Sequence, residues 1–397
     1  MEYKKISELA KQIRGVSYKP DDLHEHLDED SVILLRANNI SNGKINLDDV
    51  VYVDKRKVAF VQYLRHGDIL VCASSGSKQL VGKAASFNLT QACTFGAFCK
   101  VVRPVSDMAD YLGAYFQSEI YRRQITDVAI GANINNIRNE HIDNMILPIR
   151  TRYENQTIVD TIMNIQKIID NRSHELEMLD TLVKARFVEM FGDPQINPFG
   201  WAVVNISEVV GGKVSNGFFA KRDDYVDDGN VSILGVANIV NRMYSKVDGL
   251  PKTDADDKDI EKYEVRYGDI LFCRSSLVAE GIGKASIIPE NVQDKVLFEC
   301  HVIRLPLDLN RCVPEFIQTL STTDFFRNQV IAQSKTATMT TIGQEGILKT
   351  DIILPPVDKQ REFYDFVKQV NKSKAVVQKS LDETQVLFDS LMQKYFG

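Results

Sequence analysis

The 397-residue sequence lacks any long apolar run. Its apolar stretches, for example 50–53 and 270–272, are a few residues long, whereas a helix that spans a bilayer needs about 20. Residues 1–5 are not followed by an apolar segment of the kind found in secretory signals. With 44% hydrophobic and 26% charged residues, the composition excludes disorder and low-complexity fibres. We therefore expect a soluble, cytoplasmic, globular protein with two or three cores.

Cysteine is scarce and unpaired in the sequence. No two of the six cysteines form a Cys-x-x-Cys pair, and none stands at zinc-site spacing from a histidine, so neither a disulfide framework nor a structural metal site is expected. The sequence predicts reduced, mostly buried thiols at Cys72, Cys93, Cys99, Cys273, Cys300 and Cys312.

Positive charge is not in excess. The chain has 48 Lys and Arg against 54 Asp and Glu, which gives a net charge of −6 and a pI near 5.7. This balance argues against a protein that coats nucleic acid indiscriminately. Any basic surface must therefore be a local patch.

What the sequence does contain is an internal repeat of about 200 residues, too long for a solenoid and typical of two copies of one domain. Residues 65–75 match residues 266–276 without a gap, at an offset of 201, and both segments contain Gly-Asp-Ile-Leu. The same offset places Cys99 on Cys300, and paired cysteines indicate core packing.

Further along, the offset becomes 205 after a small insertion, and both copies reach an Ile-Leu-Pro, at 146–148 and 353–355. Before these landmarks lie loops rich in small polar residues, 131–136 and 334–341, whose chemistry differs between the copies. This contrast suggests one scaffold that recognises two different things.

Short apolar segments separated by turns indicate an α/β or α+β domain of about 150 residues in each copy. In the first copy we expect a helical stretch near 111–125 and strands at 32–35, 50–53, 68–72 and 98–102.

Each copy ends in a heptad repeat that no Pro or Gly interrupts. Eight of ten seam positions are apolar in both, from Ile158 to Met190 and from Phe363 to Tyr395, always 205 apart. A helix of roughly 38 residues is about 55 Å long, and so narrow a stripe needs a partner helix. We expect an intramolecular antiparallel coiled coil that separates two globular domains. Polar seam residues either fix the register or are tolerated at its edge: Arg172, Arg186, Lys374 and Thr384.

These features divide the chain into four segments. A first domain, 1–151, is followed by a first long helix, 152–192, that stops at Phe-Gly. A turn-forming linker and the second domain occupy 193–357, and the second helix, 358–397, ends in the same Phe-Gly.

Catalytic motifs are not convincing. Segment 76–84 has the wrong spacing for a phosphate-binding P-loop, and His24 and His26 lack a third metal ligand. Residues 197–199 resemble a truncated adenine-methylation motif, but they lie in the linker and no glycine-rich cofactor loop precedes them. The charge-rich segment 254–258 is typical of a solvated loop. The sequence predicts no catalysis, cofactor or metal in this chain.

The order and duplication of these features resemble the specificity (S) subunit of a type I restriction-modification system, over essentially the whole chain. The residues that carry the resemblance are the two Gly-Asp-Ile-Leu segments, Ile-Leu-Pro-Pro followed by Lys359-Gln360-Arg361, and 191–194 leading to 197–201. One departure is that the first copy has a single proline, Pro148, and about three extra residues before Gln156.

The resemblance implies a non-catalytic DNA reader. Each target recognition domain would read one half of a bipartite, gapped DNA target, while the helices set the spacing and dock two methyltransferase (M) subunits. Adenine methylation with S-adenosylmethionine and DNA cleavage driven by ATP and Mg²⁺ would belong to M and restriction (R) partner subunits.

Reading bases requires paired donors and acceptors, such as Arg or Lys for guanine and Asn or Gln for adenine, with Ser, Thr and Lys on phosphate. We predict DNA contacts in the first domain from Asn38, Asn39, Ser74, Ser75, Lys78, Gln79, Lys83, Asn133, Asn135 and Asn136. In the second domain we predict them from Asn238, Arg274, Ser275, Ser276, Lys284, Lys335, Thr338, Thr340 and Thr341. For the shared Ser-Ser pairs and Lys83/Lys284, phosphate contact and a structural turn both remain open. For the others, base contact and ordinary loop polarity remain open.

Two other functional classes are compatible with the residues alone. One is a duplicated protein-interaction scaffold without DNA binding, which would lack the steep salt dependence of phosphate contacts. The other is a self-sufficient methyltransferase or nuclease, which failure of the isolated chain to bind S-adenosylmethionine would exclude.

Overall fold

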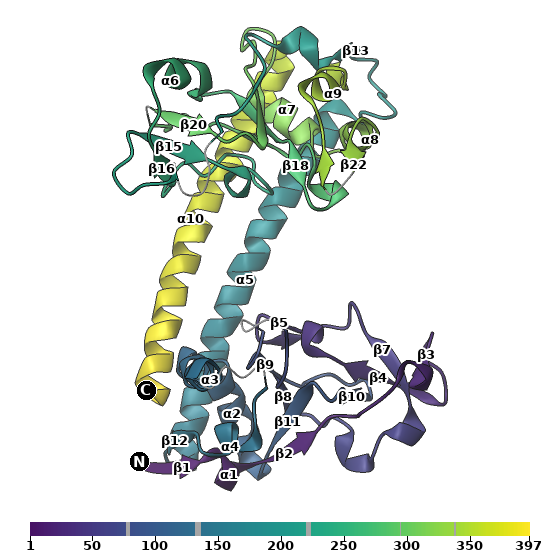
Figure 1. Ribbon diagram of the computed structural model, residues 1–397, viewed down its shortest axis with the longest axis vertical. Helices are drawn as coiled ribbons and strands as arrows, with labels where there is room; N and C mark the ends of the chain where they lie inside the picture. The colour runs from purple at the N-terminus through teal and green to yellow at the C-terminus, as the bar shows by residue number, and fades with distance from the viewer. Residues whose placement is uncertain (77–79, 132–135, 220–223, 294, 337–338) are drawn as a thin grey trace. The chain divides into compact units, whose positions relative to one another are not determined.

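The computed structural model describes the chain apart from residues 77–79, 132–135, 220–223, 294 and 337–338. It divides into two compact units: unit 1 comprises Met1–His174 with Gln378–Gly397, and unit 2 comprises Glu175–Val377. Each unit combines strands, short helices and a part of each long helix (Figure 1).

The strands of unit 1 are β1 (Glu2–Lys5), β2 (Ala10–Arg14), β3 (Leu23–His24), β4 (Ser31–Leu35), β5 (Ile40–Ser41), β6 (Lys44–Ile45), β7 (Val51–Asp54), β8 (Ile69–Cys72), β9 (Ala84–Ser86), β10 (Cys93–Phe95), β11 (Cys99–Pro104) and β12 (Ile146–Ile149). Its short helices are α1 (Ile6–Leu9), α2 (Ala109–Phe116), α3 (Glu119–Gly131) and α4 (Asn139–Asp143). One antiparallel sheet has the order β2-β11-β8-β9. A second, β10-β4-β7-β3, contains a parallel pair, β10 with β4, while β1 pairs with β12 and β5 with β6.

The strands of unit 2 are β13 (Ala202–Asn205), β14 (Ser215–Asn216), β15 (Val231–Leu234), β16 (Lys252–Thr253), β17 (Ile270–Cys273), β18 (Ser275–Ser276), β19 (Ala285–Ile287), β20 (Val296–Phe298), β21 (Val302–Leu305), β22 (Lys335–Thr336), β23 (Thr340–Thr341) and β24 (Asp351–Leu354). Its short helices are α6 (Asp257–Tyr263), α7 (Pro314–Leu320), α8 (Asp324–Ala332) and α9 (Gln344–Leu348). Its sheets, β14-β21-β17-β19, β16-β15-β20 and β13-β24, follow the plan of unit 1, including the parallel pair β15 with β20. The predicted duplication of one mixed helix-and-sheet domain is therefore confirmed.

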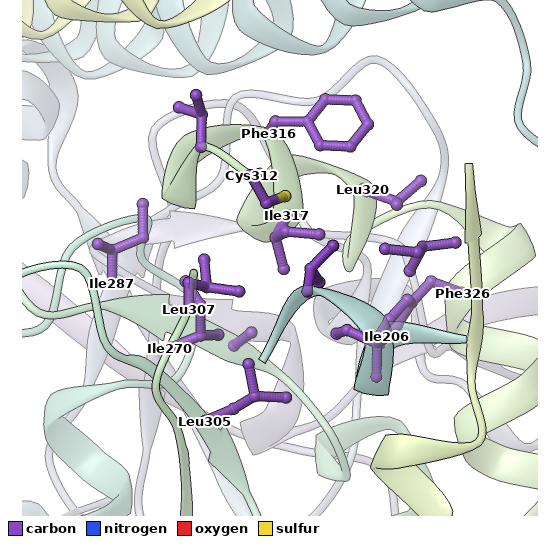
Figure 2. Close-up of a cluster of buried hydrophobic side chains, with 14 of the residues drawn as sticks. Ile206, Ile270, Ile287, Leu305, Leu307, Cys312, Phe316, Ile317, Leu320 and Phe326 are labelled. Atoms are coloured by element: carbon purple, nitrogen blue, oxygen red, sulfur yellow. The ribbon is translucent and has the colours of Figure 1, made fainter. Parts of the chain in front are cut away.

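The central strand of each unit is apolar at every position because both of its faces are buried. Side chains alternate across a strand, so Ile270 and Phe272 of β17 enter the core beneath α7, whereas Leu271 and Cys273 enter a second core. Figure 2 shows the first core, which contains Ile270 and Leu305 of the sheet together with Phe316, Ile317 and Leu320 of α7. Strand β8 divides its residues between two cores in the same way.

The predicted alignment of Cys99 in the first copy with Cys300 in the second copy is wrong. Cys99 lies opposite Cys72 across β11 and β8, but the residue opposite Cys273 is Val302. The offset is therefore 203 at this point, because the loop between β19 and β20 is two residues longer than the loop between β9 and β10. All six cysteines are free thiols, and all but Cys300 are buried.

The Ile-Leu-Pro landmarks do not coincide either. Pro148 lies inside β12, opposite Tyr3, whereas Pro355 follows the end of β24. Strands β12 and β24 remain 205 residues apart and so do the helix starts, with the result that the counterpart of Gln360 is Asn155 and not Gln156. The extra residues expected in the first copy are not there.

The stretch 111–125 forms two helices instead of one. Helix α2 ends at Phe116 and α3 begins at Glu119. Between them the Ser118 hydroxyl accepts a hydrogen bond from the backbone N–H of Tyr121 at 3.1 Å. This bond caps the start of α3 and so fixes the break.

The long helices α5 (Arg152–Phe191) and α10 (Val357–Phe396) each have 40 residues, and every predicted seam residue is buried or half-buried. In unit 1 the Arg150 guanidinium donates to the Tyr395 carbonyl, so the start of α5 lies beside the end of α10. In unit 2 the Phe187 ring lies 5.6 Å from that of Phe363, and Lys374 is paired with Asp180 at 2.7 Å. The helices run in opposite directions, as predicted.

The segment after α5 caps that helix. Gly192 has a φ of +77°, and a Cβ at this position would lie 2.4 Å from the Pro198 ring, so glycine is required. Trp201 donates from its indole N–H to the Phe191 carbonyl at 2.9 Å, and the Asn197 amide exchanges two hydrogen bonds with the Trp201 backbone. The Asn-Pro-Phe segment is therefore part of a structural linker. Throughout the described part of the chain, no helix is sufficiently long and apolar to cross a membrane.

Candidate nucleic-acid interface

In unit 2 the segment that follows β17 joins two strands from much later in the chain. Strand β18 pairs with β23, and β23 pairs with β22, which makes a small three-stranded sheet. The predicted residue Thr338 lies outside the described residues. The sheet brings together six of the predicted contact residues: Arg274, Ser275, Ser276, Lys335, Thr340 and Thr341.

Some of these side chains stabilise the sheet. Ser275 and Thr340 are 9% and 3% exposed. The Thr340 hydroxyl lies 3.0 Å from the hydroxyl of Thr336, and the Ser276 hydroxyl accepts from the backbone N–H of Val278. These three predicted residues therefore hold the loop in shape.

The remaining three side chains line a hollow of about 470 Å³. Lys335 and Thr341 are exposed, and Arg274 is half-buried, with Nη1 donating to the Cys300 carbonyl at 3.0 Å. Arginine carries five N–H donors, so this bond leaves others for a ligand.

Two residues that line the same hollow were not predicted from the sequence. Gln333 follows α8 and Lys349 follows α9, and their residue types suit adenine and phosphate respectively. Lys349 is also paired with Glu345 at 2.6 Å. Both flank the polar loop 334–341 or the helix after it, but the fold is needed to place them at the same hollow as Arg274.

In unit 1 the loop after β8 meets the segment before α4. Ser74 forms a backbone bridge with Asn136, so two predicted residues lie together. A hollow of about 290 Å³ is lined by Asn38, Ser74 and Ser75, together with Phe98, which is 71% exposed and was not predicted. The predicted residues that lie outside the described part of the chain are Lys78, Gln79, Asn133 and Asn135.

The structure contradicts the prediction that Asn39 contacts DNA. Its side chain is 0% exposed, its Oδ1 accepts from the Arg36 backbone N–H at 2.8 Å, and its Nδ2 donates to the carbonyls of Asn46 and Asp49. A side chain occupied in this way cannot reach DNA, so Asn39 stabilises its turn. Asn238, its counterpart in unit 2, is half-buried and accepts from the Gly235 backbone N–H in the same manner.

Lys83 and Lys284 are half-buried residues that precede β9 and β19. Lys284 donates from Nζ to Oδ1 of Asn241 at 2.6 Å and lines a different pocket from Arg274. Lys284, which corresponds to Lys83 of unit 1, therefore does not lie with Arg274 and the other polar loop residues that differ between the two units.

The thiols beside these loops are buried. Burial raises the pKa of Cys72 and of Cys273, each of which ends a central strand just before a Ser-Ser pair. His24 is paired with Asp28, with 2.7 Å between Nδ1 and Oδ2. Among the residues that the structure describes, no three His, Cys, Asp or Glu side chains form a group that could hold a metal ion.

Comparisons with known proteins agree with the predicted resemblance. The model of the type I restriction modification DNA specificity domain matches residues 198–384. The specificity subunit of the type I restriction enzyme StySPI of Salmonella potsdam is 29% identical, over 98% of this chain and 86% of that protein. The specificity subunit of the type I restriction enzyme EcoKI of Escherichia coli strain K12 is 27% identical over the same shares.

Two solved structures have a similar fold. The S subunit of a type I restriction-modification system from M. genitalium has a TM-score of 0.53 at 12% identity, covering 100% of this chain and 96% of that one. A chain from a structural study of complex assembly and conformational transition of the type I R-M system has a TM-score of 0.52 at 15% identity, covering 99% and 97%.

Proposed function

We propose that the chain is a specificity subunit of a type I restriction-modification system, the non-catalytic subunit that recognises the DNA sequence in such a complex, as its similarity to such subunits supports. One observation carries this function: the same scaffold occurs twice, and at the same place in each copy it presents a polar loop of different chemistry. In unit 2 this is the loop in which Ser275 pairs with Thr341, beside the hollow around Arg274, and in unit 1 it is the loop in which Ser74 pairs with Asn136, beside the hollow that Phe98 lines.

Each unit then reads one half of a bipartite, gapped target. Arg274 and Gln333 carry the donors and acceptors that distinguish bases, while Lys335 and Lys349 are suited to phosphate. The coiled coil of α5 and α10 sets the number of base pairs between the two half-sites, because a rigid spacer fixes a distance along DNA.

The exposed surface of the long helices is consistent with protein partners. Several large apolar side chains on the outward faces of the long helices are exposed, among them Met163 at 60%, Met178 at 54% and Val386 at 70%. Exposed apolar side chains of this kind mark protein interfaces, and here they would dock two methyltransferase subunits. S-adenosylmethionine, ATP and Mg²⁺ would be bound by the methyltransferase and restriction subunits, with no cofactor in this chain.

The deciding experiment is to express the chain with and without its methyltransferase subunit in a host that lacks DNA methylation, and to map modified adenines by long-read sequencing. A gapped two-part motif that appears when both subunits are present is the expected result. No new methylation from a complex that does assemble would contradict the proposal.

A second measurement separates this function from a protein-interaction scaffold, which the comparisons do not favour. Binding of the complex to duplex DNA is measured between about 50 and 200 mM salt. Contacts to several phosphates impose a steep linear fall of log K with log salt concentration. A flat salt dependence would favour the scaffold.

A further inference from the structure

Unit 2 contains a pocket of about 390 Å³ at the place where α5 passes the turn Asn241–Arg242 and the helices α7 and α8. It is separate from the hollow around Arg274, since the two share no lining residue. All of its lining residues belong to unit 2: Asp180, Val183, Lys184, Asn241, Arg242, Met243, Lys284, Ala285, Gln318, Thr319, Ser321, Thr322 and Arg327.

Positive charge predominates in this lining. Four cationic side chains contribute to it, namely Lys184, Arg242, Lys284 and Arg327. The acidic residue of the lining, Asp180, already accepts from Lys374 at 2.7 Å. Among the residues that the structure describes, no ion pair involves any of the four cations. The pocket therefore carries an uncompensated positive charge.

Two buried polar atoms in the lining lack a partner. Thr319 is 3% exposed, and its Oγ1 has no hydrogen-bond partner within the described part of the chain. The same holds for Nη1 of Arg327, whose Nη2 donates to the Glu280 carbonyl at 3.0 Å. Burial also lowers the pKa of Arg327. Unpaired buried polar atoms are rare in folded proteins, and one explanation is a missing ion.

Unit 1 provides an internal comparison, because a pocket of about 380 Å³ lies at the corresponding place. At the helix position 205 residues from Lys184 it has Asp389, and Ala114 stands 205 residues before Thr319. The turn differs as well: Asn42 and Asn241 both adopt a positive φ, but Gly43 follows the first and Arg242 the second. The same scaffold therefore holds a cationic pocket in unit 2 and a mixed one in unit 1, so the fold itself does not require the cations.

We propose that this pocket of unit 2 binds a phosphate group, with Lys184, Arg242, Lys284 and Arg327 as its cations and the Thr319 hydroxyl as a further donor. A phosphate oxyanion offers several acceptor oxygens and the negative charge that would compensate these cations. Charge-assisted hydrogen bonds from Arg and Lys are stronger than hydrogen bonds between neutral groups. The phosphate comes either from the DNA backbone or from a small free phosphate. Only the DNA source rests on the proposed function.

The first test uses the full-length chain and inorganic phosphate. Calorimetric titration and thermal unfolding are measured against sodium chloride at matched ionic strength, since a ligand that binds the folded state raises the midpoint. Thr319→Val removes a donor but keeps the shape. We expect it to bind phosphate about tenfold more weakly, as loss of one charge-assisted bond would cause, while its midpoint without phosphate is unchanged or higher. A lower midpoint with unchanged phosphate affinity would make Thr319 structural.

Lys184→Met keeps the test decisive if the threonine variant is unstable, because Lys184 is exposed on α5. It should weaken phosphate binding to a similar extent. Arg123→Met, which changes the lining of the unit 1 pocket, is the matched control and should leave phosphate affinity unchanged. Equal losses in Lys184→Met and Arg123→Met would mean an unspecific charge effect and would overturn the proposal.

The second test identifies the source of the phosphate. In the assembled complex, Arg242→Gly introduces the residue of unit 1, and the salt dependence of DNA binding is measured. A slope reduced by about 1 assigns the pocket to a backbone phosphate. An unchanged slope together with phosphate binding by the free chain assigns it to a small phosphate. If neither assay responds, the proposal is wrong. If the wild-type complex recognises no DNA sequence but the chain still binds phosphate, the proposed function is wrong and the phosphate site in this pocket is still supported.

Discussion

Arg103 holds the carboxylate of Asp68 through two parallel hydrogen bonds, from Nε to Oδ1 at 2.8 Å and from Nη2 to Oδ2 at 2.6 Å. The Asp68 side chain is 2% exposed, and its Oδ2 also accepts from the backbone N–H of Arg65. This pair ties the turn before β8 to the neighbouring strand β11. The aspartate of Gly-Asp-Ile-Leu is therefore a residue of the scaffold.

The same aspartate is held less closely in unit 2. Nε of Arg304 lies 4.0 Å from Oδ2 of Asp269, and the Arg304 guanidinium instead donates to the carbonyls of Glu264 and Lys262. Burial accordingly raises the pKa of the Asp269 carboxyl. The two copies of one motif thus differ in how well the buried charge is compensated.

We predict that the two Asp→Asn substitutions change the free energy of unfolding to different extents. Asp68→Asn leaves the guanidinium of Arg103 buried without its carboxylate, which should lower the free energy of unfolding by about 3 kcal/mol. Asp269→Asn keeps an oxygen for the Arg266 N–H and removes a poorly compensated charge, so its effect should be below about 1 kcal/mol. Urea unfolding of both variants at pH 7 measures the difference. Equal losses would show that the looser geometry at Asp269 has no energetic consequence.

The raised pKa of Asp269 also predicts a pH dependence. A carboxyl that binds its proton more tightly when folded stabilises the protein below its unfolded pKa, near 3.8, and loses that contribution as the pH rises through the folded pKa. Asp269→Asn cannot titrate. The unfolding free energy of the variant minus that of the wild type should therefore increase as the pH rises from 4 to 7. A difference that stays constant over this range would contradict the assignment.

The long helices could be predicted from the sequence because a heptad repeat is a local pattern of covalent spacing. From Ile158 to Met190, the apolar residues specify both the helix and the side that it buries. The alignment of the two copies rests on short matching segments, and these do not fix the register of the strands between them. Cys99 and Cys300 share a neighbourhood in sequence, but strand register is set by which residues face the core, and that places Val302 opposite Cys273.

The sequence indicates which residue types could contact DNA, but it does not show which way their side chains point. Arg274 and Lys335 were predicted from a polar loop, and the structure does bring them to one hollow. Asn39 has the same chemistry as a base-reading asparagine, but its amide satisfies three backbone groups of its own turn. Gln333 was missed because its place beside Arg274 depends on the pairing of β18 with β23, a contact between segments about 65 residues apart.

Arg274→Ala should weaken recognition of one half-site only. If the guanidinium contacts a base, its loss costs about 1–3 kcal/mol at the half-site read by unit 2 and leaves the other half-site unchanged. Binding to duplexes with substitutions in each half-site, once the target is known, measures this. Arg274→Lys keeps the charge but not the planar fork and should restore affinity without specificity. Equal weakening of both half-sites would make Arg274 a phosphate contact or, through its bond to Cys300, a structural residue.

The coiled coil should fix the number of base pairs between the two half-sites. Four residues inserted after Arg172 in α5 alone move every later seam residue out of step with α10, so we expect either loss of assembly or an altered spacer. The measurement is the methylated motif of the insertion variant, mapped as for the wild type. An unchanged motif from an assembled complex would contradict a rigid spacer.

The matched control keeps the heptad in both helices. Seven residues inserted after Arg172 and seven after Val377 preserve the seam on each side of the boundary between the units. Each helix becomes longer by about 10 Å, at ~1.5 Å per residue, which corresponds to about three base pairs at ~3.4 Å each. We expect this variant to assemble and to methylate the same two half-sites with a spacer about three base pairs longer, because the half-sites depend on the loops of each unit and the distance depends on the helices. Recovery of assembly with the original spacer would mean that the methyltransferase subunits, and not the coiled coil, set the separation.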